Sequence, residues 1–346
     1  MKVLGIETTC DETSAAVVEQ GPPGEPPRLL AQVVLSQVAE HEPFGGVVPE
    51  LASRSHVREL TAVIERTLAD AGCAPEELDG IAVAARPGLI GALLVGVTTA
   101  KALAWSWVKP LLAVHHLEAH LEAPALVGEV VQPPYLGVIL SGGHTALYRV
   151  EGPDPEPGRE SRLSLGATLD DAVGEAFDKV ASILGLPYPG GPAIERCAKD
   201  GDPHAVELPR SLLGPDSLDF SFSGLKTAVL YLWRGQDARG AGPIEGAPRR
   251  EDICASFQQV VADVLIEKLR RALARTGLST VVFGGGVTAN RTLRSAIEEA
   301  LGEDVRLVFP PPRFATDNGA MIAVSGLRLL AEGRTSSLDL EPEATP

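Results

Sequence analysis

The sequence has few aromatic residues, few cysteines and no long uncharged apolar run. Aromatic side chains make up 4% of its 346 residues, so the core of the folded chain must be built mainly from aliphatic side chains. Its cysteines are Cys10, Cys73, Cys197 and Cys254. They lie far apart and form no CxxC pair, which argues against a disulfide framework and against a cysteine-ligated zinc site.

No segment is typical of a signal peptide or a membrane span. The N-terminus lacks a charged region followed by an apolar run. The longest stretch without Asp, Glu, Lys or Arg is residues 130–148, and Pro133, Pro134 and a Gly-Gly pair interrupt it. We therefore expect a cytoplasmic protein without a membrane anchor.

Positive charge is scarce. Lys and Arg number 30 against 46 Asp and Glu, for a formal net charge of −16. Proteins bind nucleic acid largely by replacing phosphate counterions with Lys and Arg, so this balance counts against a nucleic-acid ligand. A role on nucleic acid would need a local basic patch or a basic partner.

Predicted strands and helices alternate along the chain, which indicates an α/β protein with mixed sheets covered by helices. One strand–turn–strand unit occurs twice. Residues 3–7 and 14–18 flank TTCDET, and residues 136–140 and 146–150 flank SGGHT. The repetition predicts an internal duplication of two related halves.

The motif HLEAH carries His116 and His120. On an α-helix this spacing places both imidazoles on one face, where they can share a metal ion. A pair of exposed helix histidines is the alternative. Asp317, at the start of the last predicted helix, is a candidate third ligand, and helix capping is its alternative role.

HLEAH also invites comparison with zinc peptidases, whose motif is HExxH. Glu118 stands two residues after His116, roughly 200° around a helix, and therefore points away from a shared metal. A metallopeptidase remains an alternative with poor support.

Gly-rich turns suit a nucleotide because backbone without side chains can approach phosphate closely. Three occur: SGGHT (141–145), YPGGP (188–192) and GGGVTAN (284–290). None matches the Rossmann or P-loop fingerprint. Together with the TTCDET hairpin they indicate a nucleotide bound between two lobes, so an ATPase or sugar kinase is a second alternative.

The motifs together resemble one family. GIETTCDETSAAVV, HLEAH, SGGHT, GEAFDKVA, YPGGP, DFSFSGLKT, GGVTANRTLR and TDNGAMIA occur in this order over nearly the whole chain. This set is similar to that of the bacterial tRNA N6-adenosine threonylcarbamoyltransferase family, TsaD, formerly described as glycoproteases.

The resemblance implies an actin-like, sugar-kinase-like fold of two duplicated ribonuclease-H-like lobes with a cleft between them. We expect one lobe over 1–130 plus 318–346 and the other over 131–317. It further implies transfer of a threonylcarbamoyl group from threonylcarbamoyl-AMP to the N6 amine of adenosine 37 in tRNAs that read ANN codons, with release of AMP.

The resemblance also implies the site residues. The positions of His116, His120 and Asp317 match metal ligands, with iron (Fe²⁺) favoured and zinc possible. The positions that match the nucleotide ligand are Ile139, Leu140, Ser141, Gly142, Gly143, Asp178, Gly191, Glu195 and Asn290. For Asp178 and Glu195, a solvated charged helix face is the alternative interpretation. Expected partners are tRNA, a TsaB-like protein and a TsaE-like ATPase.

Overall fold

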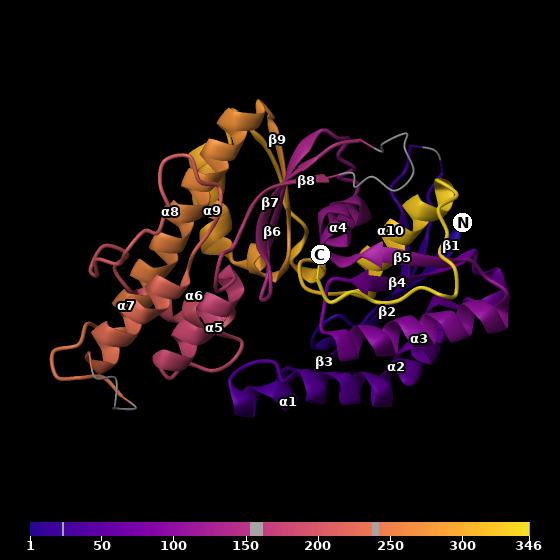
Figure 1. Ribbon diagram of the computed structural model, residues 1–346, viewed down its shortest axis with the longest axis horizontal. Helices are drawn as coiled ribbons and strands as arrows, with labels where there is room; N and C mark the ends of the chain where they lie inside the picture. Colours follow the sequence, from indigo (N-terminus) through magenta and orange to yellow (C-terminus); the bar gives the residue numbers. More distant parts are fainter. Residues whose placement is uncertain (23, 153–161, 237–241, 346) are drawn as a thin grey trace. The chain divides into compact units, whose positions relative to one another are not determined.

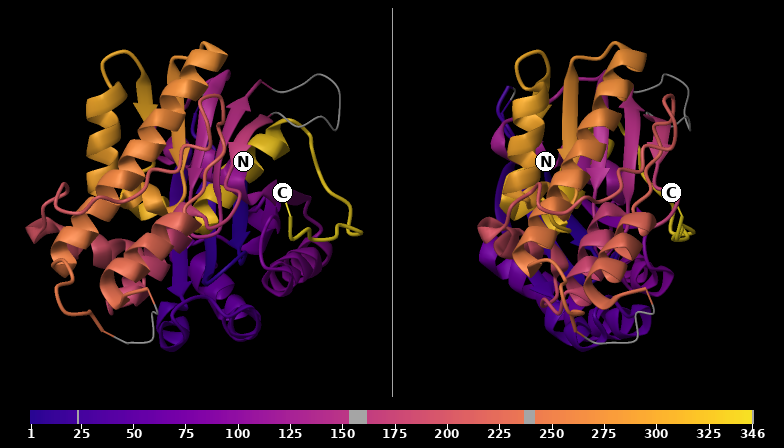
Figure 2. Two further views of the ribbon diagram at one scale, coloured as in Figure 1. Left: turned by 60° about the vertical axis from the view of Figure 1, so that its left-hand side comes forward. Right: turned by 90° about the vertical axis from the view of Figure 1, so that its left-hand side faces the viewer.

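Two five-stranded sheets, one in each of two units, organise the chain. The computed structural model describes residues 1–22, 24–152, 162–236 and 242–345. Unit 1 comprises Met1–Val130 with Arg313–Pro346, and unit 2 comprises Val131–Pro312. The ribbon is drawn in Figure 1 and, from two further directions, in Figure 2.

The sheet of unit 1 has the order β3-β2-β1-β4-β5. Central strand β1 pairs antiparallel with β2 on one side and parallel with β4 on the other. The parallel strands β1, β4 and β5 therefore end at the same edge of the sheet. The bounds are β1 (Lys2–Glu7), β2 (Glu12–Glu19), β3 (Arg28–Ser36), β4 (Gly80–Arg86) and β5 (Leu111–His115).

Alternation along these strands produces two apolar faces, because successive side chains of a strand point to opposite sides. Val3 packs in the cluster that includes α10, whereas Leu4 packs in the cluster that includes α2 and α3. Figure 1 shows α4 and α10 on one side of the sheet and α2 and α3 on the other. The helices of unit 1 are α1 (Val38–His41), α2 (Pro49–Ala71), α3 (Ile90–Trp107), α4 (His116–Glu122) and α10 (Gly319–Ala331).

Helix α3 is long and apolar enough, by length and composition alone, to cross a membrane. One face of this helix is buried in unit 1, and 33% of its residues are buried. Val97, Ala100 and Ala104 pack in the core cluster with β4, while Trp105 is 75% exposed. A core helix of this kind passes the same length and hydropathy test.

The sheet of unit 2 has the order β10-β9-β6-β7-β8. Its central strand β6 pairs antiparallel with β7 and parallel with β9. The outer pairs β7–β8 and β9–β10 are antiparallel and parallel, respectively. The bounds are β6 (Tyr135–Leu140), β7 (Thr145–Val150), β8 (Arg162–Ala167), β9 (Thr280–Gly284) and β10 (Arg306–Val308).

The two sheets thus repeat one topology: a three-stranded antiparallel meander followed by two parallel strands on the other side of the first strand. The duplication expected from the sequence is confirmed, as is the α/β class. Unit 2 has one large apolar cluster shared by its sheet and helices. These helices are α5 (Val173–Ile183), α6 (Gly190–Cys197), α7 (Ser223–Arg234), α8 (Arg250–Thr276) and α9 (Arg291–Leu301).

Three of the strands and α-helices were not expected from the sequence: α1, β8 and α6. Strand β8 adds an edge to the second sheet, and α6 begins inside YPGGP, which the sequence predicts as a turn. Gly190 belongs there because a Cβ would lie 2.5 Å from the carbonyl oxygen of Phe177. Close packing of α6 on α5 therefore overrides the low helix propensity of the Gly-Gly-Pro sequence.

Candidate metal centre and nucleotide-binding turns

HLEAH forms the short helix α4, which follows β5 directly. The ring of His115 caps the helix, since the N–H of Leu117 donates to its Nδ1 at 3.2 Å. The rings of His116 and His120 then lie one turn apart, with centroids 4.7 Å from each other. The predicted placement of both imidazoles on one helix face is confirmed.

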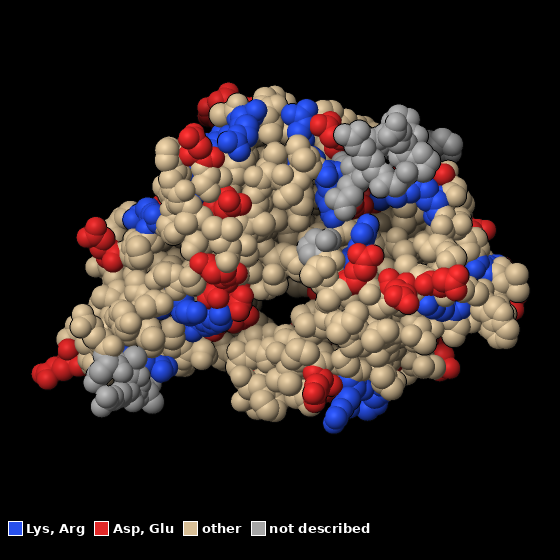
Figure 3. All heavy atoms as spheres, viewed as in Figure 1, with Lys and Arg blue, Asp and Glu red and all other residues tan. Residues whose placement is uncertain are grey.

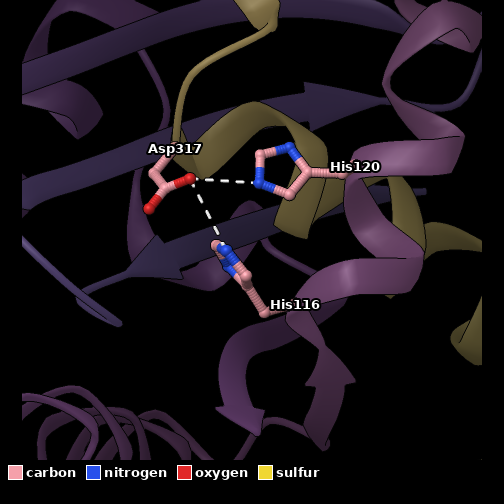
Figure 4. A group of neighbouring side chains, drawn as sticks. All are labelled: His116, His120 and Asp317. Carbon is pink, nitrogen blue, oxygen red and sulfur yellow. Dashed lines mark hydrogen bonds and ion pairs between the residues drawn. The ribbon is translucent and has the colours of Figure 1, made fainter. Parts of the chain in front are cut away.

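Asp317 reaches the same point from the segment before α10. Its Oδ1 lies 3.0 Å from Nε2 of His120 and 3.5 Å from Nε2 of His116 (Figure 4). Capping of α10 falls instead to Asn318, whose Oδ1 accepts the N–H of Met321. Asp317 is therefore not the helix cap.

Close backbone packing holds the start of α10 in place. Gly5 on β1 faces Gly319, whose carbonyl oxygen would lie 2.3 Å from a Cβ at position 5. The N–H of Gly319 also donates to Oγ of Ser14 at 2.9 Å. These contacts fix the backbone two residues after Asp317 against the sheet that leads into α4.

The three side chains suit a metal ion. One ligand atom from each of His116, His120 and Asp317 lies within 4.8 Å of the others. Both histidines are buried, and Asp317 is partly exposed. Two imidazoles and one carboxylate leave positions free on a four- or five-coordinate ion, as a catalytic site requires.

The surroundings are strongly negative. Burial, followed by the charges of Asp11 and Asp317, raises the pKa of Glu12 well above its usual value. Burial, Asp11 and Asp317 likewise raise the pKa of the Cys10 thiol. Burial lowers the pKa of His116, but Glu7 and Asp317 outweigh it and raise that pKa to about 9. A bound cation would relieve this excess of negative charge.

Glu118 takes no part in this cluster. Glu118 lies 3.7 Å from the guanidinium of Arg328 on α10. Glu122, which like Glu118 belongs to α4, lies 2.6 Å from the same guanidinium. The direction of Glu118 away from the histidines, inferred from the spacing, agrees with this pairing. Glu118 is therefore not placed to activate a metal-bound water, as the peptidase alternative would require.

In unit 2, the SGGHT turn closes between β6 and β7. Ser141 N–H donates to the carbonyl of His144 at 2.8 Å, and the N–H of His144 donates back to Ser141 Oγ at 3.0 Å. Beside Gly142 and Gly143 the space is open, because a Cβ on either would meet no atom within 4 Å. Ile139 and Leu140, which lead into the turn, are buried.

Helix α5 begins against this turn. Val173 N–H donates to Thr145 Oγ1 at 2.8 Å, and Gly174 N–H donates to the carbonyl of Ser141 at 3.1 Å. One side of the turn is therefore next to a helix N-terminus, whose dipole favours an anion.

Asp178 and Glu195, two further residues expected to bind the nucleotide, accept hydrogen bonds from backbone N–H groups. Asp178 on α5 accepts the N–H of Gly190 at 2.7 Å, at the start of α6. Glu195 on α6 accepts the N–H of Arg291 at 2.8 Å, at the start of α9. These carboxylates thus join helices. The alternative of a merely solvated face does not describe them.

Asn290 is the N-cap of α9. Its Oδ1 accepts the N–H of Leu293 at 3.0 Å, and its Nδ2 donates to Gln258 at 2.8 Å. Gln258 was not singled out by the sequence, where it is one more polar residue of a long amphipathic helix. It is buried, and its contact fixes the orientation of the Asn290 amide.

Two buried polar residues of unit 1, Glu7 and His56, were also not identified from the sequence. Glu7 is buried beside His116, and His56 is buried in contact with Thr13 and the Cys10 carbonyl. The sequence does contain a signal for both residues, because each is a polar residue in an apolar strand or on the apolar side of a helix. A charged residue at the end of the apolar strand VLGIE, or a histidine on the apolar side of a helix, needs a buried partner.

Comparisons with known proteins agree with these observations. The family model for TsaD, tRNA N6-adenosine threonylcarbamoyltransferase, matches residues 28–324. The tRNA N6-adenosine threonylcarbamoyltransferase of Anaeromyxobacter dehalogenans (strain 2CP-C) is 49% identical over 344 residues, covering 99% of this chain and 98% of that protein. That of Brucella melitensis biotype 2 (strain ATCC 23457) is 49% identical over 352 residues, covering 99% and 94%.

Solved structures give the fold. Full-length HypF in a phosphate- and nucleotide-bound form is similar with a TM-score of 0.59 and 14% identity, covering 97% of this chain and 47% of that one. Component A of the Acidaminococcus fermentans (R)-2-hydroxyglutaryl-CoA dehydratase is similar with a TM-score of 0.53 and 16% identity, covering 96% and 99%. Both support the expected actin-like fold. With its sequence matched from end to end by named relatives, the chain belongs to the tRNA N6-adenosine threonylcarbamoyltransferase family.

Proposed function

We propose that this threonylcarbamoyltransferase takes the threonylcarbamoyl group from threonylcarbamoyl-AMP and transfers it to the N6 amine of adenosine 37 in tRNAs that read ANN codons, releasing AMP. Membership in the family establishes threonylcarbamoyl transfer to a tRNA adenosine. The donor, the position in the tRNA, the metal and the partners are parts of the proposal.

The observation that carries the metal role is the meeting of His116, His120 and Asp317 around one point. Nitrogen and carboxylate ligands of this kind suit Fe²⁺, which we favour, or Zn²⁺. When bound, the metal would act as a Lewis acid that stabilises negative charge on a carbonyl or phosphate oxygen. His116, His120 and Asp317 would hold the ion.

The Gly-rich turns of unit 2 support binding of an adenylate. The open backbone at Gly142, Gly143 and Gly191 allows a phosphate or ribose to approach without meeting a side chain. The N-terminus of α5 adds a favourable dipole. Carbamoyl-adenylates are already activated, so binding and orientation suffice and no covalent enzyme intermediate is required.

The acidic composition supports help from partners in tRNA binding. Several basic side chains are engaged within the chain, since Lys268 is buried and donates to the carbonyls of Leu212 and Ser217, and Arg58 pairs with Glu40. On the face in Figure 3, basic side chains mostly lie beside acidic ones. We propose that TsaB-like and TsaE-like proteins act with this chain, and that tRNA affinity of the isolated chain is poor.

Exposed apolar side chains on α3 supply a surface that a protein partner would cover. Ile90 and Leu94 are about half exposed and Trp105 is largely exposed. Apolar groups gathered on one helix face are typical of interaction sites. The cytoplasm, where tRNA is found, is the proposed compartment.

The test is a reconstituted reaction. The chain is incubated with tRNA, threonine, bicarbonate, ATP, the adenylate-forming enzyme and both partners, and tRNA nucleosides are analysed by mass spectrometry. Threonylcarbamoyl-adenosine at position 37 is expected. Modification at another adenosine would contradict the proposed position. Casein cleavage inhibited by a chelator would favour the peptidase, and ATP hydrolysis without tRNA would favour the kinase-like alternative.

A further inference from the structure

We propose that Glu7 orients His116 for metal binding, acting through the imidazole ring and not by coordinating the ion. The inference rests on the proposed metal centre. It adds a fourth side chain, a buried carboxylate that stands outside the group formed by His116, His120 and Asp317.

The fold brings Glu7 to the histidine. Glu7 is the last residue of β1, and His115 is the last residue of β5. Both strands run parallel to β4, which lies between them, so their carboxyl ends meet at one edge of the sheet. His116 then begins α4 at that edge, and Glu7 lies fully buried beneath it.

Both carboxylate oxygens of Glu7 are engaged. Oε1 accepts the backbone N–H of Thr9 at 2.6 Å, inside the hairpin that follows β1. Oε2 lies 3.0 Å from Nδ1 of His116 and accepts its hydrogen. The first contact fixes the carboxylate, and the second leaves the carboxylate no free oxygen aimed at a metal.

The contact with Glu7 determines which ring nitrogen of His116 is available to bind a metal. A neutral imidazole carries one N–H, and donation from Nδ1 to Glu7 leaves the lone pair on Nε2. Nε2 is the atom that lies 3.5 Å from Oδ1 of Asp317. Glu7 therefore holds the ring in the tautomer and orientation that point its lone pair at the shared site, and a carboxylate acceptor also strengthens the imidazole as a ligand.

The second histidine is held differently. Nε2 of His120 lies 3.0 Å from Asp317, whereas its Nδ1 is buried without a hydrogen-bond partner among the described residues. Among the described residues, orientation by a carboxylate at Nδ1 is thus a property of His116 and not of His120. Loss of Glu7 should affect one ligand and leave the other ligand's environment unchanged.

Charge supports the same role. A buried carboxylate is costly unless it faces positive charge. Glu7 and Asp317 together supply two negative charges around the histidines, which a divalent ion balances. A contribution of Glu7 only to hairpin structure, through Thr9, would require no contact with His116 and would leave metal binding unchanged.

The experiment is a Co²⁺ titration of the metal-stripped full chain, followed by the visible absorption of the bound ion, which reports coordination geometry. The variants are Glu7→Gln, which keeps size and removes charge, and Glu7→Ala. The control is Thr67→Val, which removes another buried polar group of unit 1 whose hydroxyl donates to the carbonyl of Val63. Thermal unfolding of each metal-free variant is measured in parallel.

Removing a side chain that orients a metal ligand typically weakens binding by about 10–100-fold. We expect a loss of that size for Glu7→Ala, a smaller loss for Glu7→Gln and an altered Co²⁺ spectrum in both. Thr67→Val should bind like the wild type. Wild-type affinity and spectrum in Glu7→Gln and Glu7→Ala would overturn this inference while leaving the metal centre intact. Absence of Co²⁺ binding by the wild type would overturn the metal centre and the role of Glu7 with it.

Discussion

Nε2 of His120 lies 3.0 Å from Oδ1 of Asp317, although 197 positions separate the two residues in the sequence. The C-terminal segment returns to the first unit, where α10 packs on β1, β2 and β4 and is joined to α4 by Arg328. The candidate metal site therefore depends on the long-range packing of one helix as much as on the HxxxH motif.

The apparent metal affinity should rise with pH. In the metal-free chain, Glu7 and Asp317 overcome the effect of burial and raise the pKa of His116 from 6.5 to about 9. Below pH 9, a metal must displace one proton, so affinity should rise by about tenfold per pH unit and level off near pH 9. Zn²⁺ titrations against a competing chelator between pH 6.5 and 9.5 measure this slope.

The same proton stabilises the metal-free fold. Because the folded pKa lies above the unfolded value, this stabilisation is fully present below pH 6.5 and is lost as the pH rises through 9. A Zn²⁺ affinity that does not change between pH 6.5 and 8.5 would contradict a protonated His116 in the metal-free chain.

Arg328 should stabilise the site by joining two helices. Its Nε donates to Glu122 at 2.6 Å, and Glu122 also accepts the hydroxyl of Ser325 at 2.5 Å. Charge-assisted hydrogen bonds contribute about 1.5–3 kcal/mol each when partly buried, so Arg328→Met should lower the free energy of unfolding by about 1–3 kcal/mol and weaken metal binding. Urea unfolding and metal titration measure the two effects.

Arg334→Met is the matched control, because Arg334 pairs with Glu332 and is 60% exposed. Such a surface substitution should change the free energy of unfolding by less than about 0.5 kcal/mol. Equal effects of the two substitutions would mean that the contact between α4 and α10 is not what Arg328 provides.

His56 should make the stability of unit 1 depend on pH. Its Nε2 donates to the carbonyl of Cys10 at 2.9 Å and its Nδ1 accepts the hydroxyl of Thr13 at 2.7 Å, so the neutral ring fits this network. Burial lowers its pKa below 6.5 despite the contact with Cys10. The unfolded chain therefore binds more protons than the folded chain just below pH 6.5, and stability should fall as the pH falls through that value.

Urea midpoints at pH 5.5 and 7.5 test this. The change in midpoint from pH 5.5 to pH 7.5 should be less positive in His56→Gln than in the wild type and unchanged in His204→Gln, which alters an exposed histidine of unit 2. An unchanged pH difference in His56→Gln would exclude His56 as its source.

Gly191 and Gly190 make a matched pair for the nucleotide site. A Cβ at position 191 meets no atom within 4 Å, whereas one at position 190 would lie 2.5 Å from the carbonyl oxygen of Phe177. Gly191→Val should therefore weaken AMP binding, by roughly 5- to 150-fold if the added side chain costs about 1–3 kcal/mol against the ligand. Gly190→Ala should destabilise unit 2.

Calorimetric titration with AMP and thermal unfolding separate the two effects. If Gly191→Val binds AMP as tightly as the wild type, the open side of Gly191 does not face the nucleotide.

Local sequence patterns predicted most of the fold and the placement of His116 and His120 on one helix face. The spacing of His116 and His120 is a helical property, and the two strand–turn–strand units are visible as apolar runs around polar turns. The start of α6 was hidden because Gly190 and Gly191 disfavour a helix, and only contact with α5 explains it. Glu7 was hidden because its partner lies 109 positions away.

Asp317 shows the limit of local reasoning at the site. From sequence alone, helix capping and metal binding fitted it equally well, since Asp favours both positions. The structure assigns the cap to Asn318 and turns Asp317 toward the histidines. That choice depends on how α10 packs against β1 and β2, which no short motif encodes.

The most direct test of the account measures transfer and metal content together. The reconstituted reaction is run with His120→Ala, Asp317→Asn and Glu118→Gln, each checked for metal by elemental analysis, and threonylcarbamoyl-adenosine is quantified by mass spectrometry. We expect the first two variants to lose metal and to lose transfer by about 100-fold or more, as when a group that stabilises transition-state charge is removed, while Glu118→Gln keeps both. Wild-type transfer by metal-free Asp317→Asn would contradict the central role of the His116, His120 and Asp317 centre.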